Sequence, residues 1–134
     1  MEWDPDSPEA REILRAPAPE DPVDPEMAAA GEDLYRRLGC AGCHSLGQGD
    51  FQGPDLVGVT VRRDYPWFRG MVMRPDSMIR WDRDAQILAE RFRAPMPDQG
   101  ASELQTRALW EYLRRVDGAG PSRGALETDG GEEP

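Results

Sequence analysis

The chain has 134 residues, the length of about one domain, and a formal net charge of −10 at pH 7. Hydrophobic residues make up only 38% of it, and no run approaches the roughly 20 apolar residues of a membrane-spanning helix. The N-terminus lacks the basic start and apolar stretch of a signal peptide. These features exclude a membrane-spanning chain. If the protein works outside the cytoplasm, we expect that its export signal or anchor has been removed.

The acidic residues are concentrated at the two ends of the chain. Residues 1–26 contain nine acidic residues, two arginines and six prolines, too little apolar surface to fold. We expect a disordered linker or tail there, with a spacer to a membrane anchor or another domain as the alternative. Residues 118–134 predict a disordered acidic tail that mainly solvates the chain. The folded domain is expected over residues 27–117, where charges nearly balance.

In the central segment, apolar residues first recur at helical spacing just before the first cysteine. They are Gly31, Leu34, Tyr35 and Leu38. This pattern predicts a helix that runs into Cys40. The glycine-rich residues 45–63 predict a loop, and no stretch shows the alternation typical of a strand.

Two short helices are predicted in the middle of the chain. Asp64 as N-cap and Pro66 in the first turn predict a helix over residues 65–73, which ends near Pro75. A second helix is expected over residues 83–93.

The last predicted helix begins at a capping box formed by Ser102 and Gln105. Its apolar stripe consists of Leu109, Tyr112, Leu113 and Val116. Four short helices joined by long loops make a thin core. We therefore expect something other than side chains to fill the centre of the domain.

The sequence CAGCH at positions 40–44 holds both cysteines and the only histidine of the chain. A structural zinc site needs four ligands, and only three soft ligands are present. A thioredoxin-like redox pair would follow a strand, and a simple disulfide would leave His44 without a role. Covalent haem attachment uses all three residues, because Cys40 and Cys43 bond the porphyrin vinyl groups while His44 binds the iron. The haem would also supply the missing core.

The sixth ligand of the haem iron cannot be a second histidine of this chain. Methionines, weaker donors and water remain. Met96 lies between two prolines in a stiff, non-helical stretch that can present a thioether to iron, and we favour it. Met78, in a loop after Pro75, is its competitor, whereas Met71 and Met73 are expected to pack against the ring.

Residues 31–116 resemble a class I c-type cytochrome. The motifs that carry the resemblance are Gly31-x3-Tyr35 before CAGCH, GPDL at 53–56, MP at 96–97 and LWEYL at 109–113. The surrounding stretches further resemble small bacterial monohaem domains of respiratory chains. The resemblance implies an all-α cytochrome c fold, with about four short helices and long loops wrapped around one covalent haem.

The resemblance also implies roles for individual residues. Cys40 and Cys43 would carry the thioether bonds, and His44 and Met96 would be the axial ligands of the iron. The carbonyl oxygen of Pro54 would accept the Nδ1 proton of His44 and fix the ring.

Two further sets of residues follow from the resemblance. The haem propionates would be contacted by Arg62, Arg63 or Trp67, with a solvated charged loop as the alternative for the two arginines. The first and last helices would cross at Gly31, Tyr35, Leu109 and Tyr112.

Ligation decides between electron transfer and catalysis. A His/Met iron has no open position, and thioether ligation favours Fe(II) and raises the reduction potential. An enzyme would need an open site with an acid–base group beside it, and Asp98 is more simply a loop residue. We therefore expect a carrier rather than an enzyme, one that shuttles single electrons between respiratory partners. The alternatives are a haem-based ligand sensor, with a dissociable distal methionine, or a haem module of a larger redox enzyme.

The expected partners are redox proteins, namely a respiratory donor and an acceptor such as a terminal oxidase or reductase. They would dock transiently at the exposed haem edge. We expect a monomer with no nucleic-acid partner, which touches a membrane only through an N-terminal anchor. The family resemblance implies a location in the periplasm or on the outer face of the membrane.

Overall fold

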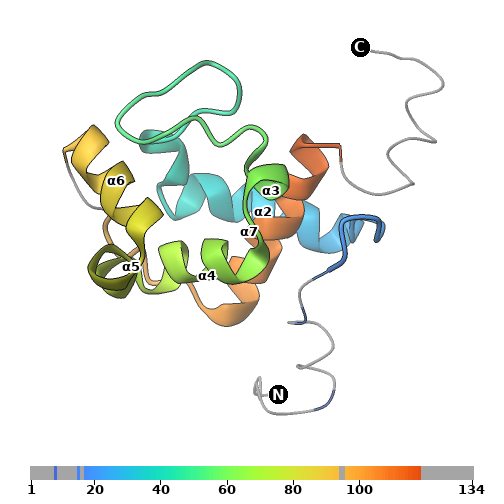
Figure 1. The fold of residues 1–134 in the computed structure, drawn as a ribbon. Coiled ribbons are helices and arrows are strands. Elements are labelled where there is room, and N and C mark those ends of the chain that lie inside the picture. The colour runs from blue at the N-terminus through green and yellow to red at the C-terminus, as the bar shows by residue number, and fades with distance from the viewer. Residues whose placement is uncertain (1–7, 9–14, 16, 94–95, 119–134) are drawn as a thin grey trace.

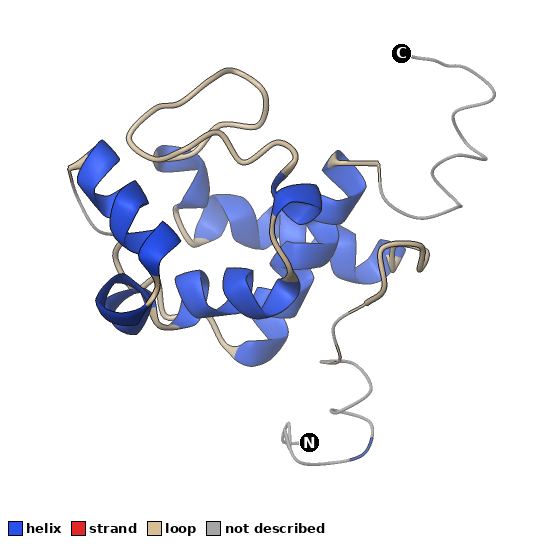
Figure 2. Ribbon diagram, in the orientation of Figure 1, coloured by secondary structure: helices blue, strands red, loops and turns tan. Residues whose placement is uncertain are grey.

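The computed structural model describes Pro8, Arg15, and residues 17–93 and 96–118 (Figure 1). In these residues it contains helices and loops but no strand (Figure 2). The elements are α2 (Pro25–Arg37), the 3₁₀ turn η1 (Cys40–Gly42), α3 (Val59–Arg62), α4 (Tyr65–Met73), α5 (Pro75–Trp81), α6 (Arg83–Phe92) and α7 (Glu103–Val116). The predicted all-α class is confirmed.

Side-chain caps fix where four of the helices begin. Asp24, Asp64 and Asp82 accept backbone N–H groups from the first turns of α2, α4 and α6, respectively. The predicted capping box opens α7: Ser102 Oγ accepts the Gln105 N–H at 3.1 Å, and Gln105 Oε1 accepts the Ser102 N–H at 2.9 Å. These local contacts explain why the starts of α4 and α7 could be read from the sequence.

Helices α2 and α7 cross at a glycine. A Cβ atom on Gly31 would lie 2.1 Å from the Ala108 carbonyl oxygen and 2.8 Å from the Tyr112 Cβ. The rings of Tyr35 and Tyr112 meet beside this point, with 5.6 Å between their centroids. The crossing was predicted at these positions, although the backbone that Gly31 touches belongs to Ala108 rather than to Leu109.

Aromatic side chains join α4 to α7. The Trp110 ring lies 4.9 Å from that of Phe68 and 5.6 Å from that of Tyr65, measured between centroids. At the rim of this cluster, Arg69 donates two hydrogen bonds to the Glu103 carboxylate. These contacts place α4 along α7 and form one side of the core.

Two short helices were not predicted. Helix α3 lies in the stretch 45–63, which was predicted as loop, and α5 holds Met78, which was expected in a loop. Pro75 was taken as a helix terminator, but it occupies the first position of α5, where its missing N–H costs no hydrogen bond. Proline therefore both ends α4 and begins α5.

The domain begins earlier than residue 27. Helix α2 starts at Pro25, and residues 17–24 make hydrogen bonds to α7. The predicted boundary after residue 26 therefore falls inside a helix. The predicted C-terminal tail lies, beyond Gly118, outside the described residues. No helix in the described part of the chain is long and apolar enough to cross a membrane.

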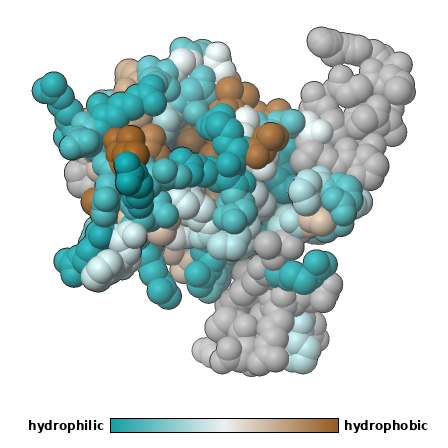
Figure 3. Space-filling model, in the orientation of Figure 1, coloured by the Kyte–Doolittle hydropathy of each residue, from teal (hydrophilic) through white to brown (hydrophobic). Residues whose placement is uncertain are grey.

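The face of the molecule in Figure 3 is mainly hydrophilic, with separate apolar patches among the coloured residues. The large apolar side chains that lie exposed are Phe51, Val57, Val61, Trp81 and Ile87. The first three belong to the loop between η1 and α3 or to α3 itself, whereas Trp81 and Ile87 lie at the end of α5 and on α6.

Candidate functional site

A cavity of about 320 Å³ lies at the centre of the domain. Each of the helices α2 to α7 contributes to its wall, and the wall is almost entirely apolar. Its aliphatic and aromatic lining includes Leu56, Val59, Phe68, Val72, Ile79, Leu88, Phe92, Leu109 and Leu113. Cys40, Cys43, His44 and Met96 lie in the same wall. The thin core predicted from the sequence thus corresponds to a real central hollow.

The CAGCH motif forms a tight turn at one side of the cavity. Gly39 has a φ of 85°, a left-handed conformation that glycine adopts without strain. The N–H groups of Cys43 and His44 both donate to the Cys40 carbonyl oxygen, at 3.2 and 3.0 Å. Cys40 and Cys43 form no disulfide, and burial raises the pKa of the Cys40 thiol. Both sulfur atoms are therefore free to bond a group held in the cavity.

The imidazole of His44 is oriented by the backbone of the next loop. Its Nδ1 lies 2.8 Å from the Pro54 carbonyl oxygen. Because a carbonyl only accepts, Nδ1 carries the proton and Nε2 keeps its lone pair for a metal. Gly53 makes room for the ring, since a Cβ there would lie 2.6 Å from His44 Cε1. This geometry agrees with the role predicted for Pro54.

Asp55 organises the loop that carries Pro54. Its carboxylate accepts the N–H groups of Gly47, Gly49 and Val57, at 2.9, 2.8 and 2.9 Å. These bonds, chiefly those from Val57 and Gly47, lower the pKa of Asp55. Sequence analysis assigned no role to this residue, although an aspartate in a glycine-rich loop is a recognisable turn signal.

Asp117 fixes the other end of the same loop. Its two carboxylate oxygens accept the Gly58 N–H at 2.6 Å and the Thr60 N–H at 3.0 Å, and the Thr60 hydroxyl donates at 2.7 Å. The short helix α3 is thus capped from the C-terminal end of α7. The partners are nearly 60 positions apart in the chain, so no local pattern could have shown this contact.

Of the four candidate methionines, two line the cavity and two do not. Met96 and Met71 line the cavity, and Met71 does so from α4. Met78 instead lies against Gly70, where a Cβ would be 2.6 Å from the Met78 sulfur, and it is not among the cavity residues. Met73 packs against the buried core cluster. The structure therefore places Met96 in the site and turns its predicted competitor Met78 toward α4.

Trp67 lines the cavity, but its indole N–H already forms a hydrogen bond outside it. It donates to the Asp82 carboxylate at 3.0 Å, and this bond is the main reason that the pKa of Asp82 is lowered. The Arg63 guanidinium lies over the Trp67 ring, 4.1 Å from its centroid, and forms an ion pair with Asp84. These contacts tie α4 to α6 across one edge of the cavity.

The two arginines predicted near the propionates occupy a second, more polar hollow that shares Trp67 with the cavity. Arg62 donates to the Val57 carbonyl oxygen at 2.7 Å, and Arg63 is held as described above. Arg91, which the sequence analysis missed, lines this hollow from α6 and pairs with Asp50. The hollow therefore carries positive side chains from α3 and α6.

The sequence matches the cytochrome c family over residues 28–117. The chain belongs to this family. Among solved structures, cytochrome c from Rhodothermus marinus is 32% identical with a TM-score of 0.69, and the match covers 83% of this chain and 97% of that chain. An engineered form of the Rhodothermus protein, Rma TDE, is 32% identical with a TM-score of 0.68, and its match covers 83% and 98%.

The same engineered protein bound to a carbene intermediate is 31% identical with a TM-score of 0.66, and its match covers 83% of this cytochrome c and 98% of the engineered chain. No curated protein matches the sequence. The family and the structural likeness confirm the cytochrome c fold and the covalent haem c that the motifs predicted.

The residues of this cytochrome c fit such a cofactor. Two unpaired thiols and an imidazole with its Nδ1 engaged meet at one side of a large apolar hollow. Cys40 and Cys43 would hold the porphyrin through thioether bonds, and the apolar wall would face its ring. When bound, the haem supplies a one-electron couple, Fe(III)/Fe(II).

Proposed function

We propose that this cytochrome c is a His44/Met96-ligated electron carrier. The single observation that supports it best is the joint presence of an oriented His44 imidazole and the Met96 thioether in the wall of one cavity. A family that typically carries electrons, and a chain with no second histidine, favour the same conclusion.

The chain would tune the couple through His44 and Met96. The Pro54 carbonyl oxygen, at 2.8 Å from Nδ1, holds the ring in one orientation and increases the basicity of Nε2. The Met96 thioether, where it binds the iron, would favour the reduced state and raise the reduction potential. Since Gly53 and Asp55 hold the loop in place, little rearrangement is needed between the two redox states.

The cavity wall offers little for acid–base catalysis. Outside the CAGCH motif, its polar side chains in the described residues are Tyr35, Gln52 and Trp67. The Tyr35 hydroxyl donates a hydrogen bond to the His44 carbonyl oxygen at 3.3 Å. The pKa of Tyr35 is raised to about 12, chiefly because the side chain is buried. No carboxylate or second imidazole lies among them. This lining favours a carrier over an enzyme.

The partners would be respiratory redox proteins that dock where the loop 50–53 meets solvent. Phe51 lies 63% exposed there, beside Gln52 of the cavity wall. A small apolar contact next to the haem suits a transient redox complex. Cytochrome c domains in bacteria typically work outside the cytoplasm, and we place this one in the periplasm or at the outer membrane face.

The test is an absorption spectrum of the haem-loaded protein, oxidised and reduced, with and without carbon monoxide. A closed site predicts low-spin spectra in both states, a weak far-red methionine-to-Fe(III) band and no reaction with carbon monoxide. Rapid carbon monoxide binding at neutral pH would overturn the closed site. It would instead support a ligand-binding haem with a dissociable Met96, for which the engineered relative bound to a carbene intermediate offers a parallel.

A further inference from the structure

A buried cluster of charges lies on α7, away from the haem cavity. Glu111 is fully buried, and Arg107 and Arg114 are 8% and 3% exposed. Arg107 and Arg114 both form ion pairs with the Glu111 carboxylate. Charged side chains are rarely buried this completely unless they are paired and hydrogen-bonded. We call these three residues the Arg–Glu–Arg cluster.

The cluster and the cavity occupy opposite faces of one helix. Leu109 and Leu113 face the cavity from α7. At about 100° per residue, Arg107, Glu111 and Arg114 project roughly 140–200° around the helix from Leu109. The cluster thus marks the back of α7 with respect to the haem.

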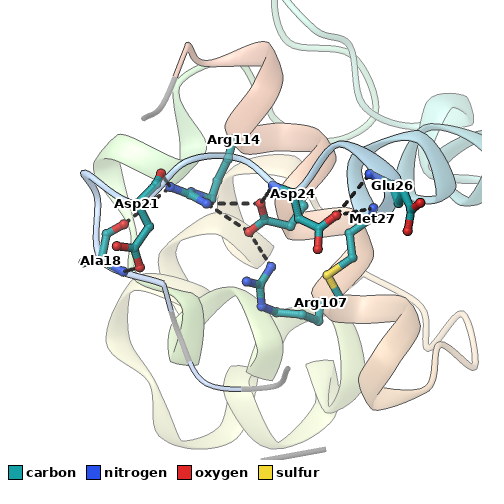
Figure 4. Close-up of polar contacts among 8 residues, drawn as sticks. Ala18, Asp21, Asp24, Glu26, Met27, Arg107 and Arg114 are labelled. Carbon is teal, nitrogen blue, oxygen red and sulfur yellow. Dashed lines mark hydrogen bonds and ion pairs between the residues drawn. The ribbon is translucent and has the colours of Figure 1, made fainter. Parts of the chain in front are cut away.

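Residues 17–24 cover this face, and we call them the strap. The Asp24 N–H donates to Glu111 Oε1 at 2.9 Å. Arg114 donates to the carbonyl oxygens of Ala18 and Asp21. Figure 4 shows the Arg114 side chain directed toward Ala18 and Asp21, with the Arg107 guanidinium close to it.

The strap is itself folded for this contact. The Ala18 N–H donates to the Asp21 carboxylate at 2.9 Å, and the Asp21 N–H donates to the Ala18 carbonyl oxygen at 3.0 Å. This turn directs two carbonyl oxygens toward Arg114. At the end of the strap, Asp24 caps α2 by accepting the N–H groups of Glu26 and Met27.

The strap supplies further hydrogen-bond partners to Arg114 and Glu111, whereas the buried Nε of Arg107 has no partner among the described residues. Two arginines face one carboxylate, so the buried charges do not cancel among themselves. The strap carbonyl oxygens provide the remaining hydrogen-bond acceptors for Arg114, and its Asp24 N–H satisfies a lone pair of Glu111. Removing the strap would leave buried donors and acceptors without protein partners, which is costly.

We propose that the strap is a docking segment that fixes where the N-terminal part of the chain leaves the domain. Its binding surface is the Arg–Glu–Arg cluster on the back of α7. The strap therefore enters the domain on the face of α7 opposite the haem cavity. A tether or domain joined to the chain through the strap would leave the partner-binding edge open, a consequence that rests on the proposed function. The docking itself does not depend on which residue ligates the iron.

Amide hydrogen exchange in the haem-loaded protein tests the docking. In the wild type, the amides of Ala18, Asp21 and Asp24 should be protected. Arg114→Met keeps the apolar stem but removes the donors, and should accelerate their exchange on the order of tenfold or more. The control Arg37→Met, which breaks the exposed pair with Asp33, should leave them protected. Unprotected strap amides in the wild type, or unchanged protection in Arg114→Met, would overturn the proposal.

A distance measurement keeps the proposal testable if Arg114→Met does not fold. Glu20 is exposed, and Cys40 and Cys43 are consumed by haem, so a nitroxide attached to Glu20→Cys is the only spin label. Its distance to low-spin Fe(III) should form one narrow distribution. A broad distribution would mean that the strap is undocked. The haem spectrum of the labelled protein reports separately on the iron ligands, so failure of either proposal is seen without the other.

Discussion

At the scale of single residues, the site depends on Gly53 as much as on the ligands themselves. A Cβ at this position would meet the His44 ring at 2.6–3.3 Å, on three ring atoms. The backbone is fixed there by the Gly53 N–H, which donates to the Cys43 carbonyl oxygen at 2.7 Å. The ring therefore has to move if a methyl group is added.

Gly53→Ala is expected to displace the His44 ring and weaken its bond to Pro54. We expect a loss of about 1–3 kcal/mol in the free energy of unfolding, as for other overpacked sites, together with a shifted reduction potential. Gly42→Ala, where the added Cβ meets no atom within 4 Å, is the control. Denaturant unfolding and potentiometry of both variants measure the effect. If the two variants had the same free energy of unfolding and the same reduction potential, Gly53 would not be needed to make room for the His44 ring.

Asp55 gives the stability of the protein a dependence on acid. The pKa of Asp55 is lower in the folded chain than in the unfolded chain, because its carboxylate accepts three backbone N–H bonds. The stabilisation from this group is therefore complete above its unfolded pKa of about 3.9. It is lost as the pH falls through the lower folded pKa.

Asp55→Asn should lower the melting temperature at neutral pH and flatten its decline on acidification. The comparison is a series of thermal melts of the haem-loaded wild type and variant between neutral and strongly acidic pH. The two curves should converge at low pH, where the wild-type carboxyl is protonated. A constant gap over the whole range would show that the carboxylate charge does not stabilise the loop.

The site residues that could be predicted from the sequence are those that lie close together in the chain. The CAGCH motif placed Cys40, Cys43 and His44 together because they are adjacent in the chain. Asp117, by contrast, acts on Gly58 and Thr60, and only the folded chain brings them together. The indole of Trp67 could be predicted to lie at the site, but its bond to Asp82 could not.

At the scale of helices, α2 and α7 cross in close contact at Gly31. Gly31→Ala would place a Cβ 2.1 Å from the Ala108 carbonyl oxygen, and a backbone atom cannot move aside as a side chain can. We expect the helices to separate and the free energy of unfolding to fall by about 1–3 kcal/mol or more. Gly42→Ala is again the matched control. Denaturant unfolding that leaves Gly31→Ala as stable as this control would contradict the close crossing.

The helices that could be predicted carry their own start signals. Asp64, Ser102 and Gln105 act within one turn of their helices, so their patterns are visible in the sequence. Helix α3 has four residues and depends on Asp117. Helix α5 begins at Pro75, and the same proline ends the preceding helix because its ring disfavours helical backbone at Arg74. Short helices set by distant partners or by ambiguous prolines escape a local analysis.

At the scale of the whole molecule, the cofactor replaces much of the hydrophobic core. Helices α2 to α7 all line the cavity of about 320 Å³, and its wall is almost entirely apolar. Without the haem, these side chains would face water or collapse onto one another. A chain expressed without haem attachment should therefore keep part of its helical far-UV signal but lose the near-UV signal of fixed aromatic packing.

Circular dichroism and thermal melts of the haem-free chain test this expectation. Cys40→Ala/Cys43→Ala prevents the thioether bonds and provides the haem-free form, with the loaded wild type as control. A sharp cooperative melt of the haem-free chain, with native near-UV signal, would mean that the side chains alone fill the core.

The N-terminal segment shows the limit of compositional reasoning for the whole chain. Proline and acidic residues led us to predict a disordered linker or tail over residues 1–26. Yet residues 17–24 are bound by charge and backbone polarity, through Glu111 and Arg114, rather than by apolar burial. Composition cannot predict such a contact, because arginines are usually exposed and nothing in the sequence shows that Arg107 and Arg114 are buried.

NMR of the reduced haem protein reports whether Met96 binds the iron. With ¹³C-labelled methionine methyl groups, a thioether bonded to low-spin Fe(II) lies over the porphyrin, whose ring current shifts one methyl signal strongly upfield. We expect one such signal, lost in Met96→Leu and retained in Met71→Leu. No shifted signal, or one that persists in Met96→Leu, would mean that Met96 does not bind the iron.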